Sequence, residues 1–265
     1  MTKKVYYHFQ RLNQELDIWK KLQHVHIVPL YGVVNDMGHY ASMVSPWMDN
    51  GNASKYFEGQ DVQTTLPRRL KLLYEVASGL EYLHCFSPPI IHGDLKASNI
   101  LVSDSGHALL TDFGISTLIE EATGTEQSAS TFAGSVRWMA FELFNPYGST
   151  RSIEESQGSV QLTTYSDIWS FGSTVLEVLS GKLPYYYRKK DVQVVHEILL
   201  GIKPLHDKLR SAYPSISSEI WSFLLTCWKD DPRSRPSITH VKDTIGHLFK
   251  ERRRMGIVFN EEGFL

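Results

Sequence analysis

The sequence predicts an α+β fold with a small N-terminal part, made of one helix and two strands, and a larger part that is mainly helical. Three observations support this prediction. The chain has 265 residues and 42% hydrophobic content, so it can bury a sizeable core. Apolar residues recur at helical spacing along most of the chain. Short apolar runs bounded by turn-forming residues, which are typical of strands, lie in the first half.

The N-terminal part begins with apolar residues at helical spacing, which predict a helix that ends near residue 24. Two strands are predicted next, at residues 27–34 and 40–44, with a turn between them. Residues 45–52 are rich in helix-breaking residues and are expected to form a loop. This loop leads into the larger part.

Apolar periodicity in the larger part predicts a series of helices. They lie near residues 66–84, 192–200, 218–228 and 238–253, and a further, strongly apolar helix opens at Ser166 and stops at Gly181. Two polar stretches interrupt the pattern. We expect a mobile loop at 116–131 and a surface insertion at 145–164.

Composition narrows the class of protein. The formal net charge of -2 argues against a role in binding nucleic acids or membrane surfaces through bulk charge. Cys85 and Cys227 form no metal-binding pair of C-x-x-C type. The sequence shows no run typical of a signal peptide and no uncharged stretch of transmembrane length. An intracellular, cytoplasmic protein is therefore expected.

The stretch from residue 90 to 114 carries the chemistry. It is predicted to contain two short apolar strands with a polar loop, in which Asp94, Lys96 and Asn99 stand at fixed offsets. Asp112 follows on a tight Gly turn. One acid can accept a proton from an alcohol, and the amide and the second acid can hold a hard cation through oxygen. Together with a lysine, these are the groups that phosphoryl transfer requires.

Residues 92–99, H-G-D-L-K-A-S-N, resemble the protein-kinase catalytic loop H-R-D-L-x-x-x-N, and residues 112–114 are that family's D-F-G motif. Residues 134–142, G-S-V-R-W-M-A-F-E, are similar to the kinase segment G-T-x-x-W-M-A-P-E. The resemblance implies a protein-kinase-like fold. Its mainly helical large lobe would span residues 49–265, and a truncated small lobe and hinge, with helix C and two strands, would span residues 1–48.

The resemblance also implies ATP and Mg²⁺ as cofactors and a protein hydroxyl as the acceptor. Asp94 would act as the catalytic base, Lys96 would assist the γ-phosphate, and Asn99 and Asp112 would hold Mg²⁺. The residues that it implies for nucleotide binding are Glu15, Pro46, Met48 and Leu101. The lysine two residues after Asp94 favours serine and threonine over tyrosine as the acceptor.

Four further residues have implied supporting roles. Glu142 would be a buried acid paired with Arg235, and Ser135 would support the substrate site. Asp167 would cap its helix and steady the backbone of the catalytic loop.

One part of the family's pattern is missing. No G-x-G-x-x-G precedes Glu15, and the basic residues ahead of it fall at a predicted helix start rather than in a strand. We therefore expect a chain that is truncated at its N-terminus, with weak Mg·ATP binding and little or no phosphoryl transfer by these residues alone.

Two alternatives to a Ser/Thr protein kinase remain open. The H-G-D of residues 92–94 is typical of small-molecule kinases of the aminoglycoside or choline type, although these generally lack the segment at 134–142. A pseudokinase that acts by binding is favoured by the missing Gly-rich loop. It is opposed by the presence of every catalytic residue of the large lobe.

Overall fold

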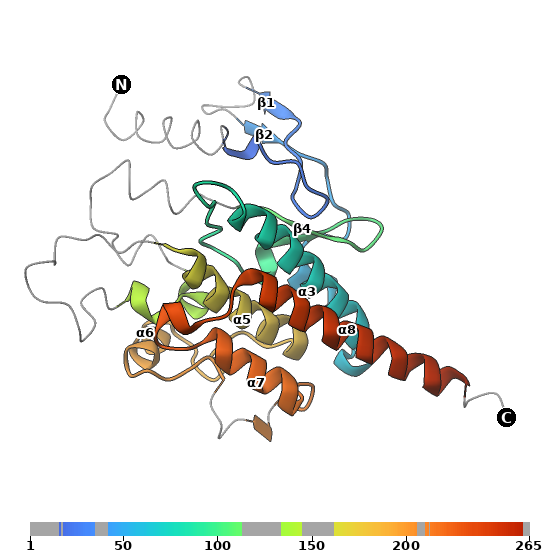
Figure 1. Ribbon diagram of the computed structural model, residues 1–265, viewed down its shortest axis with the longest axis vertical. Coiled ribbons are helices and arrows are strands. Elements are labelled where there is room, and N and C mark those ends of the chain that lie inside the picture. The colour runs from blue at the N-terminus through green and yellow to red at the C-terminus, as the bar shows by residue number, and fades with distance from the viewer. Residues whose placement is uncertain are drawn as a thin grey trace, which may run out of the picture.

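The computed structural model describes residues 16, 18–34, 42–112, 134–144, 162–205, 210–211 and 213–261, without the side chains of 255–261. A small part that contains the strands β1 and β2 lies beside a larger, mainly helical part (Figure 1). The expected loop at 116–131 and most of the expected insertion at 145–164 lie outside the described residues, as does the predicted N-terminal helix up to residue 15.

The small end contains a two-stranded antiparallel sheet. Strand β1 (Gly32–Val34) pairs with β2 (Ser42–Val44), with Gly32 opposite Val44. The strand predicted over residues 27–34 is therefore wrong in its first half. Residues 26–28 pair instead with a strand of the larger part, since Val28 donates to the Leu110 carbonyl at 3.0 Å and Leu110 donates to His26 at 2.9 Å. Pro29, which has no N–H, separates the two pairings.

The larger part contains the helices α2 (Ala53–Tyr56), α3 (Val62–His84), α5 (Thr164–Ser180), α6 (Asp191–Leu199), α7 (Ser218–Cys227) and α8 (Ile238–Glu261). The bounds of α3, α5, α6 and α7 lie within four residues of the predicted ones, whereas α8, which was predicted to end near residue 253, continues to Glu261. Helix α3 begins four residues before its predicted start because Asp61 caps it, accepting the Thr64 N–H at 2.9 Å. Helix α2 was not predicted. It is a single turn capped by Asn52.

Besides the 3₁₀ residues 210–211, the described part also contains a second antiparallel sheet and four short 3₁₀ helices. Strand β3 (Ile100–Val102) pairs with β4 (Ala108–Leu110). The 3₁₀ helices are η1 (Ala97–Asn99), η3 (Val136–Trp138), η4 (Phe141–Leu143) and η7 (Pro232–Ser234). Helix η1 and β3 follow directly from the polar loop, so the sheet fixes the loop's outgoing end.

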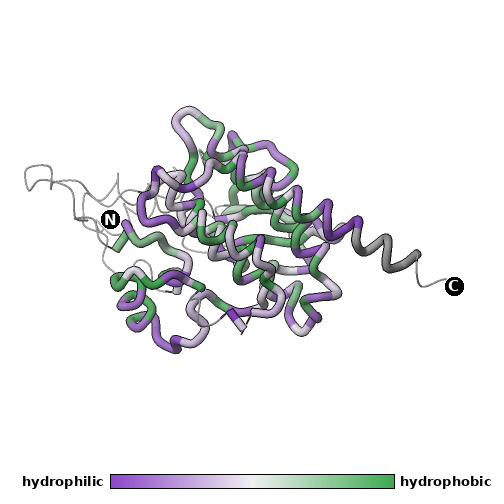
Figure 2. The backbone as a smooth tube through the Cα atoms, turned by 60° about the horizontal axis from the view of Figure 1, so that its bottom comes forward, coloured by the Kyte–Doolittle hydropathy of each residue, from purple (hydrophilic) through white to green (hydrophobic). Residues whose placement is uncertain are grey.

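Helix α5 is the centre of the core, and nearly all of its residues are buried. It packs against α3 and α7, while α3 also packs against α8 and β4. The outer helix α8 shows alternating hydrophilic and hydrophobic positions along its course toward the C-terminus (Figure 2). Its buried residues recur at helical spacing, as expected for a helix that covers a core with one face: Ile238, Val241, Ile245 and Leu248.

The predicted ion pair between Glu142 and Arg235 is present. Arg235 donates from both terminal nitrogens to the two Glu142 oxygens, each at 2.7 Å. The arginine side chain is fully buried, whereas 25% of the Glu142 side chain is exposed, so the acid is less buried than predicted. Removing the acid would leave a buried guanidinium without its charge partner, which is costly.

Among the described helices, none has the length and apolar character needed to cross a membrane.

Gly79, in the middle of α3, provides a test of this packing. A Cβ there would lie 2.8 Å from the carbonyl oxygen of His26, which is itself held by Leu110. We expect Gly79→Ala to lower the free energy of unfolding by about 1–3 kcal/mol, measured by denaturant titration. In an open helix the same change would raise it by about 1 kcal/mol. Ser78→Ala is the control, with an expected change within about 0.5 kcal/mol; a stabilised Gly79→Ala variant would contradict the close packing.

Candidate active site

Asp167 holds the start of the loop at residues 92–99. Its buried carboxylate accepts the backbone N–H of His92 at 2.8 Å on Oδ2 and that of Gly93 at 2.9 Å on Oδ1. His84 Nε2, at the end of α3, lies 2.8 Å from the same Oδ2. The predicted role in steadying the loop therefore agrees with these contacts. The predicted capping role is wrong, because Thr163 and Ser166 form the capping box of α5.

Glu177, three turns further along α5, holds the middle of the loop. Its Oε2 accepts the Ala97 N–H at 3.0 Å and the Trp138 indole N–H at 2.9 Å. Burial raises the pKa of Glu177 to about 7, although both hydrogen bonds favour the ionised form. The hydroxyl of Thr174, on the same helix, shares its proton between the Ser170 carbonyl at 2.8 Å and the Leu95 carbonyl of the loop at 3.2 Å. One helix thus fixes the loop at its start and at its middle.

The loop presents an acid between two donors. Lys96 Nζ lies 2.8 Å from Asp94 Oδ2 and 2.7 Å from the hydroxyl of Ser135. Asn99 Nδ2 donates to the Asp94 carbonyl oxygen at 2.8 Å and to Oδ2 at 2.9 Å. The Asp94 side chain remains 30% exposed. A carboxylate oriented in this way can accept a proton, and the lysine can neutralise negative charge beside it.

Asp112 lies close enough to the loop to interact with it electrostatically. Partial desolvation, with a contribution from the negative charge of Asp94, raises the pKa of the Asp112 carboxyl, although the residue is exposed; His92 and Lys96 act in the opposite direction. Its φ of 58° is uncommon for a residue other than glycine. A carboxyl group whose ionised form is disfavoured in this way is suited to a cation, because a bound positive charge favours the carboxylate. Burial lowers the pKa of the His92 imidazole, which favours its uncharged form.

Three of the residues predicted to bind nucleotide are described, two of them just after β2 and one in β3. Pro46 and Met48 follow β2 and are half-buried. Leu101 is half-buried in β3, and an isolated bridge joins it to Asn52. Glu15 lies outside the described residues, as does the D-F-G motif beyond Asp112.

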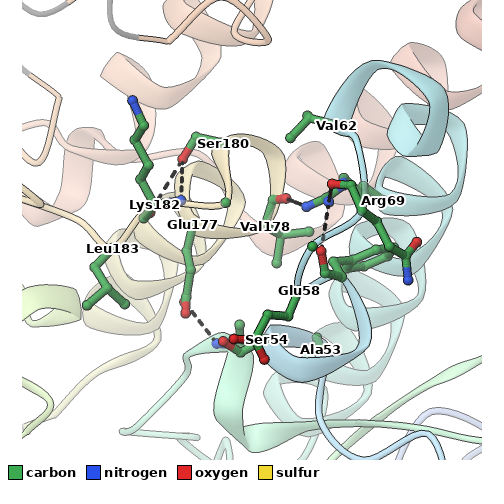
Figure 3. Close-up of a pocket in the computed structure, with 15 residues that line it drawn as sticks. Ala53, Ser54, Glu58, Val62, Arg69, Glu177, Val178, Ser180, Lys182 and Leu183 are labelled. Atoms are coloured by element: carbon green, nitrogen blue, oxygen red, sulfur yellow. Dashed lines mark hydrogen bonds between the residues drawn. The ribbon is translucent and has the colours of Figure 1, made fainter.

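A separate pocket of about 470 Å³ adjoins the loop at Ala97 (Figure 3). It is lined by α2, the start of α3 and the end of α5, and Glu177 forms part of its wall. Arg69 closes one side, with a buried guanidinium that donates to the carbonyl oxygens of Val178, Phe57 and Gln60. Its lining does not include Pro46, Met48 or Leu101, so it is distinct from the predicted nucleotide site.

Two residues of the site were missed in the sequence. Glu177 is an acid inside an otherwise apolar helix, which is the signal that could have identified it, since a buried acid needs partners. His84 gave no such signal. It ends an amphipathic helix, and only the packing of α3 against α5 brings it to Asp167.

Comparison with known proteins finds similarity to protein kinases over nearly the whole chain. A family model described as protein tyrosine and serine/threonine kinase matches residues 2–245. Serine/threonine-protein kinase CTR1 of Arabidopsis thaliana is 30% identical over 249 residues, which cover 92% of this chain. Mitogen-activated protein kinase kinase 2 of the same plant is 33% identical over 241 residues, or 89% of this chain. A probable serine/threonine-protein kinase of Dictyostelium discoideum is 30% identical over 239 residues, or 88% of this chain.

The chain spans only part of each of these relatives. It covers 28% of the first, 59% of the second and 20% of the third.

The raised pKa of Glu177 predicts a pH-dependent stability. The folded pKa of about 7 lies above the ordinary value of 4.5, so the folded state keeps a proton that the unfolded state loses, and stability falls as pH rises through this interval. Gln can accept the same two hydrogen bonds without a charge. Between pH 5 and pH 8, we expect the free energy of unfolding of Glu177→Gln to rise by about 2–3 kcal/mol relative to that of the wild type, measured by urea unfolding.

Glu58→Gln, an exposed acid on the rim of the same pocket, is the matched control and should follow the wild type at both pH values. A Glu177→Gln curve parallel to the wild-type curve would show that Glu177 is ionised throughout.

Proposed function

Because the chain belongs to the protein tyrosine and serine/threonine kinase family, we propose that it transfers the γ-phosphate of ATP to serine or threonine hydroxyls of protein substrates. The observation that carries this proposal is the single carboxylate of Asp94, oriented by Lys96 and Asn99 and partly open to solvent. Its relatives in the comparisons are named as serine/threonine or mitogen-activated protein kinase kinases.

Each loop residue has a distinct role in this proposal. Asp94 accepts the proton of the acceptor hydroxyl as it attacks. Lys96 places its ammonium beside that carboxylate and stabilises the charge of the transferred group, and Ser135 keeps it there through a 2.7 Å hydrogen bond. The lysine at this position favours serine and threonine as acceptors.

The donor set also fits Mg²⁺. The side-chain N–H of Asn99 donates to Asp94, and its Oδ1, which accepts only a long hydrogen bond of 3.4 Å from the Ser98 hydroxyl, can serve as a ligand for a hard cation. Desolvation, with a smaller contribution from the charge of Asp94, raises the pKa of the Asp112 carboxyl, and a divalent cation held by Asn99 and Asp112 would favour its ionised form. When bound with ATP, Mg²⁺ neutralises charge on the phosphate oxygens.

We further propose that residues 1–48 belong to the small lobe and hinge, and that residues 49–265 form the large lobe. Pro46, Met48 and Leu101 contact the adenine in this arrangement, and Glu15 pairs with an ATP-binding lysine. The 265 residues contain no G-x-G-x-x-G. In this proposal these residues by themselves bind Mg·ATP weakly and transfer little phosphate, because a Gly-rich loop that would shield the phosphates from water is not among them.

The roles of Asp94 and Asp112 can be separated by measurement. In a form carrying a Gly-rich loop and lysine upstream, we expect robust transfer from γ-labelled ATP to a protein substrate. Asp94→Ala should lower it about 100-fold or more, as expected for loss of a general base. Asp112→Asn should weaken Mg²⁺-dependent binding of a fluorescent ATP analogue, which Asp94→Ala should largely preserve.

Asp104→Ala, an exposed acid in the turn between β3 and β4, is the control and should leave both readouts unchanged. Failure of the extended form to transfer phosphate, with nucleotide binding intact, would favour the pseudokinase alternative. Full activity of the Asp94→Ala variant would exclude the proposed base.

A further inference from the structure

Three side chains that are suited to metal binding meet on the surface, on two helices that carry none of the loop residues. Glu219 lies in the first turn of α7, and His247 and Glu251 lie one turn apart on α8. One ligand atom from each residue lies within 4.8 Å of the other two. The i, i+4 spacing places the imidazole and the second carboxylate on the same face of α8.

Electrostatics at this point favour a cation. Two carboxylates from different helices converge there, and His247 Nε2 lies 3.2 Å from Glu251 Oε1. Among the described residues, Glu219 makes no hydrogen bond or ion pair with its side chain. Arg210, close to the start of α7, donates to Ser218 and lies over the Trp221 ring instead. A divalent ion would neutralise both carboxylates at once.

The donor set identifies the class of metal. One imidazole and two carboxylates are ligands that Zn²⁺ accepts, with a fourth position left for water. Tetrahedral bonds of about 2.0 Å place ligand atoms about 3.3 Å apart, which is within reach of these side chains after small rotations. Ca²⁺ needs more oxygen ligands than this group supplies, and Mg²⁺ does not prefer imidazole.

The geometry points to a Zn²⁺ site formed by Glu219, His247 and Glu251, which joins α7 to α8. The two helices pack on different neighbours, α7 on α5 and α8 on α3. A metal bridge between them therefore adds a link that the described packing provides only weakly. The site stabilises the helical lobe by binding only to its folded form.

The test uses the full chain and Zn²⁺ itself, with binding measured by isothermal titration calorimetry and, for geometry, by the visible spectrum of the Co²⁺-substituted protein. We expect one Zn²⁺ per chain. Losing a direct ligand should cost at least as much as losing a second-shell partner, so His247→Gln and Glu219→Gln should each weaken binding at least about tenfold. His240→Gln, an exposed histidine on the same helix, should bind as the wild type does.

Cys85, an exposed thiol, is a competing ligand, so Cys85→Ser is a second control and should also bind as the wild type does. Cys227 is buried, and burial raises the pKa of its thiol to about 12, so it is not in competition. With Zn²⁺ about 100-fold above its Kd, the Tm of the wild type should rise by about 5 °C, and that of His247→Gln should not. Absence of binding, or equal binding by wild type and His247→Gln, would overturn the site.

Discussion

The carboxylate of Asp167 joins the helical core to the loop that carries the proposed chemistry. It sits on a helix that is buried along nearly its whole length, so its position is fixed by packing. Its two oxygens accept the first backbone N–H groups of the loop, where Gly93 has a φ of 77° that few other residues would adopt. Asp94 is the next residue, so the position of its carboxylate depends on these two hydrogen bonds.

The same helix provides a second anchor, and the two differ in chemistry. At Glu177, burial raises the pKa to about 7, so the anchor is an acid close to its titration point rather than a fixed charge. Glu177 also accepts the Trp138 indole N–H, which ties η3 to the loop. Ser135, next to η3, in turn holds Lys96. One helix thus positions the base, the lysine and the segment that contacts the lysine.

The proposed phosphoryl-transfer site and the proposed zinc site lie in different parts of the helical lobe. The residues proposed for phosphoryl transfer lie in the loop at 92–99 and at Asp112, two residues after β4, whereas Glu219, His247 and Glu251 lie on α7 and α8. The first set is held by buried hydrogen bonds to the core. The second set consists of surface side chains that the core brings together without fixing them. This difference is why the first is proposed as preorganised for catalysis and the second as completed by its metal.

The sequence by itself determined the longer helices apart from the end of α8, the order of the motifs and the pair Glu142–Arg235, because apolar periodicity and short motifs are local in the chain or carried by the family resemblance. It placed the strand at 27–34 wrongly, since the choice of partner for residues 26–28 depends on Leu110, more than 80 positions away. It also missed His84 and Glu177. Only the tertiary structure decided that His84 meets Asp167 and that Glu177 meets Ala97, because each of these contacts joins residues 80 or more positions apart in the chain.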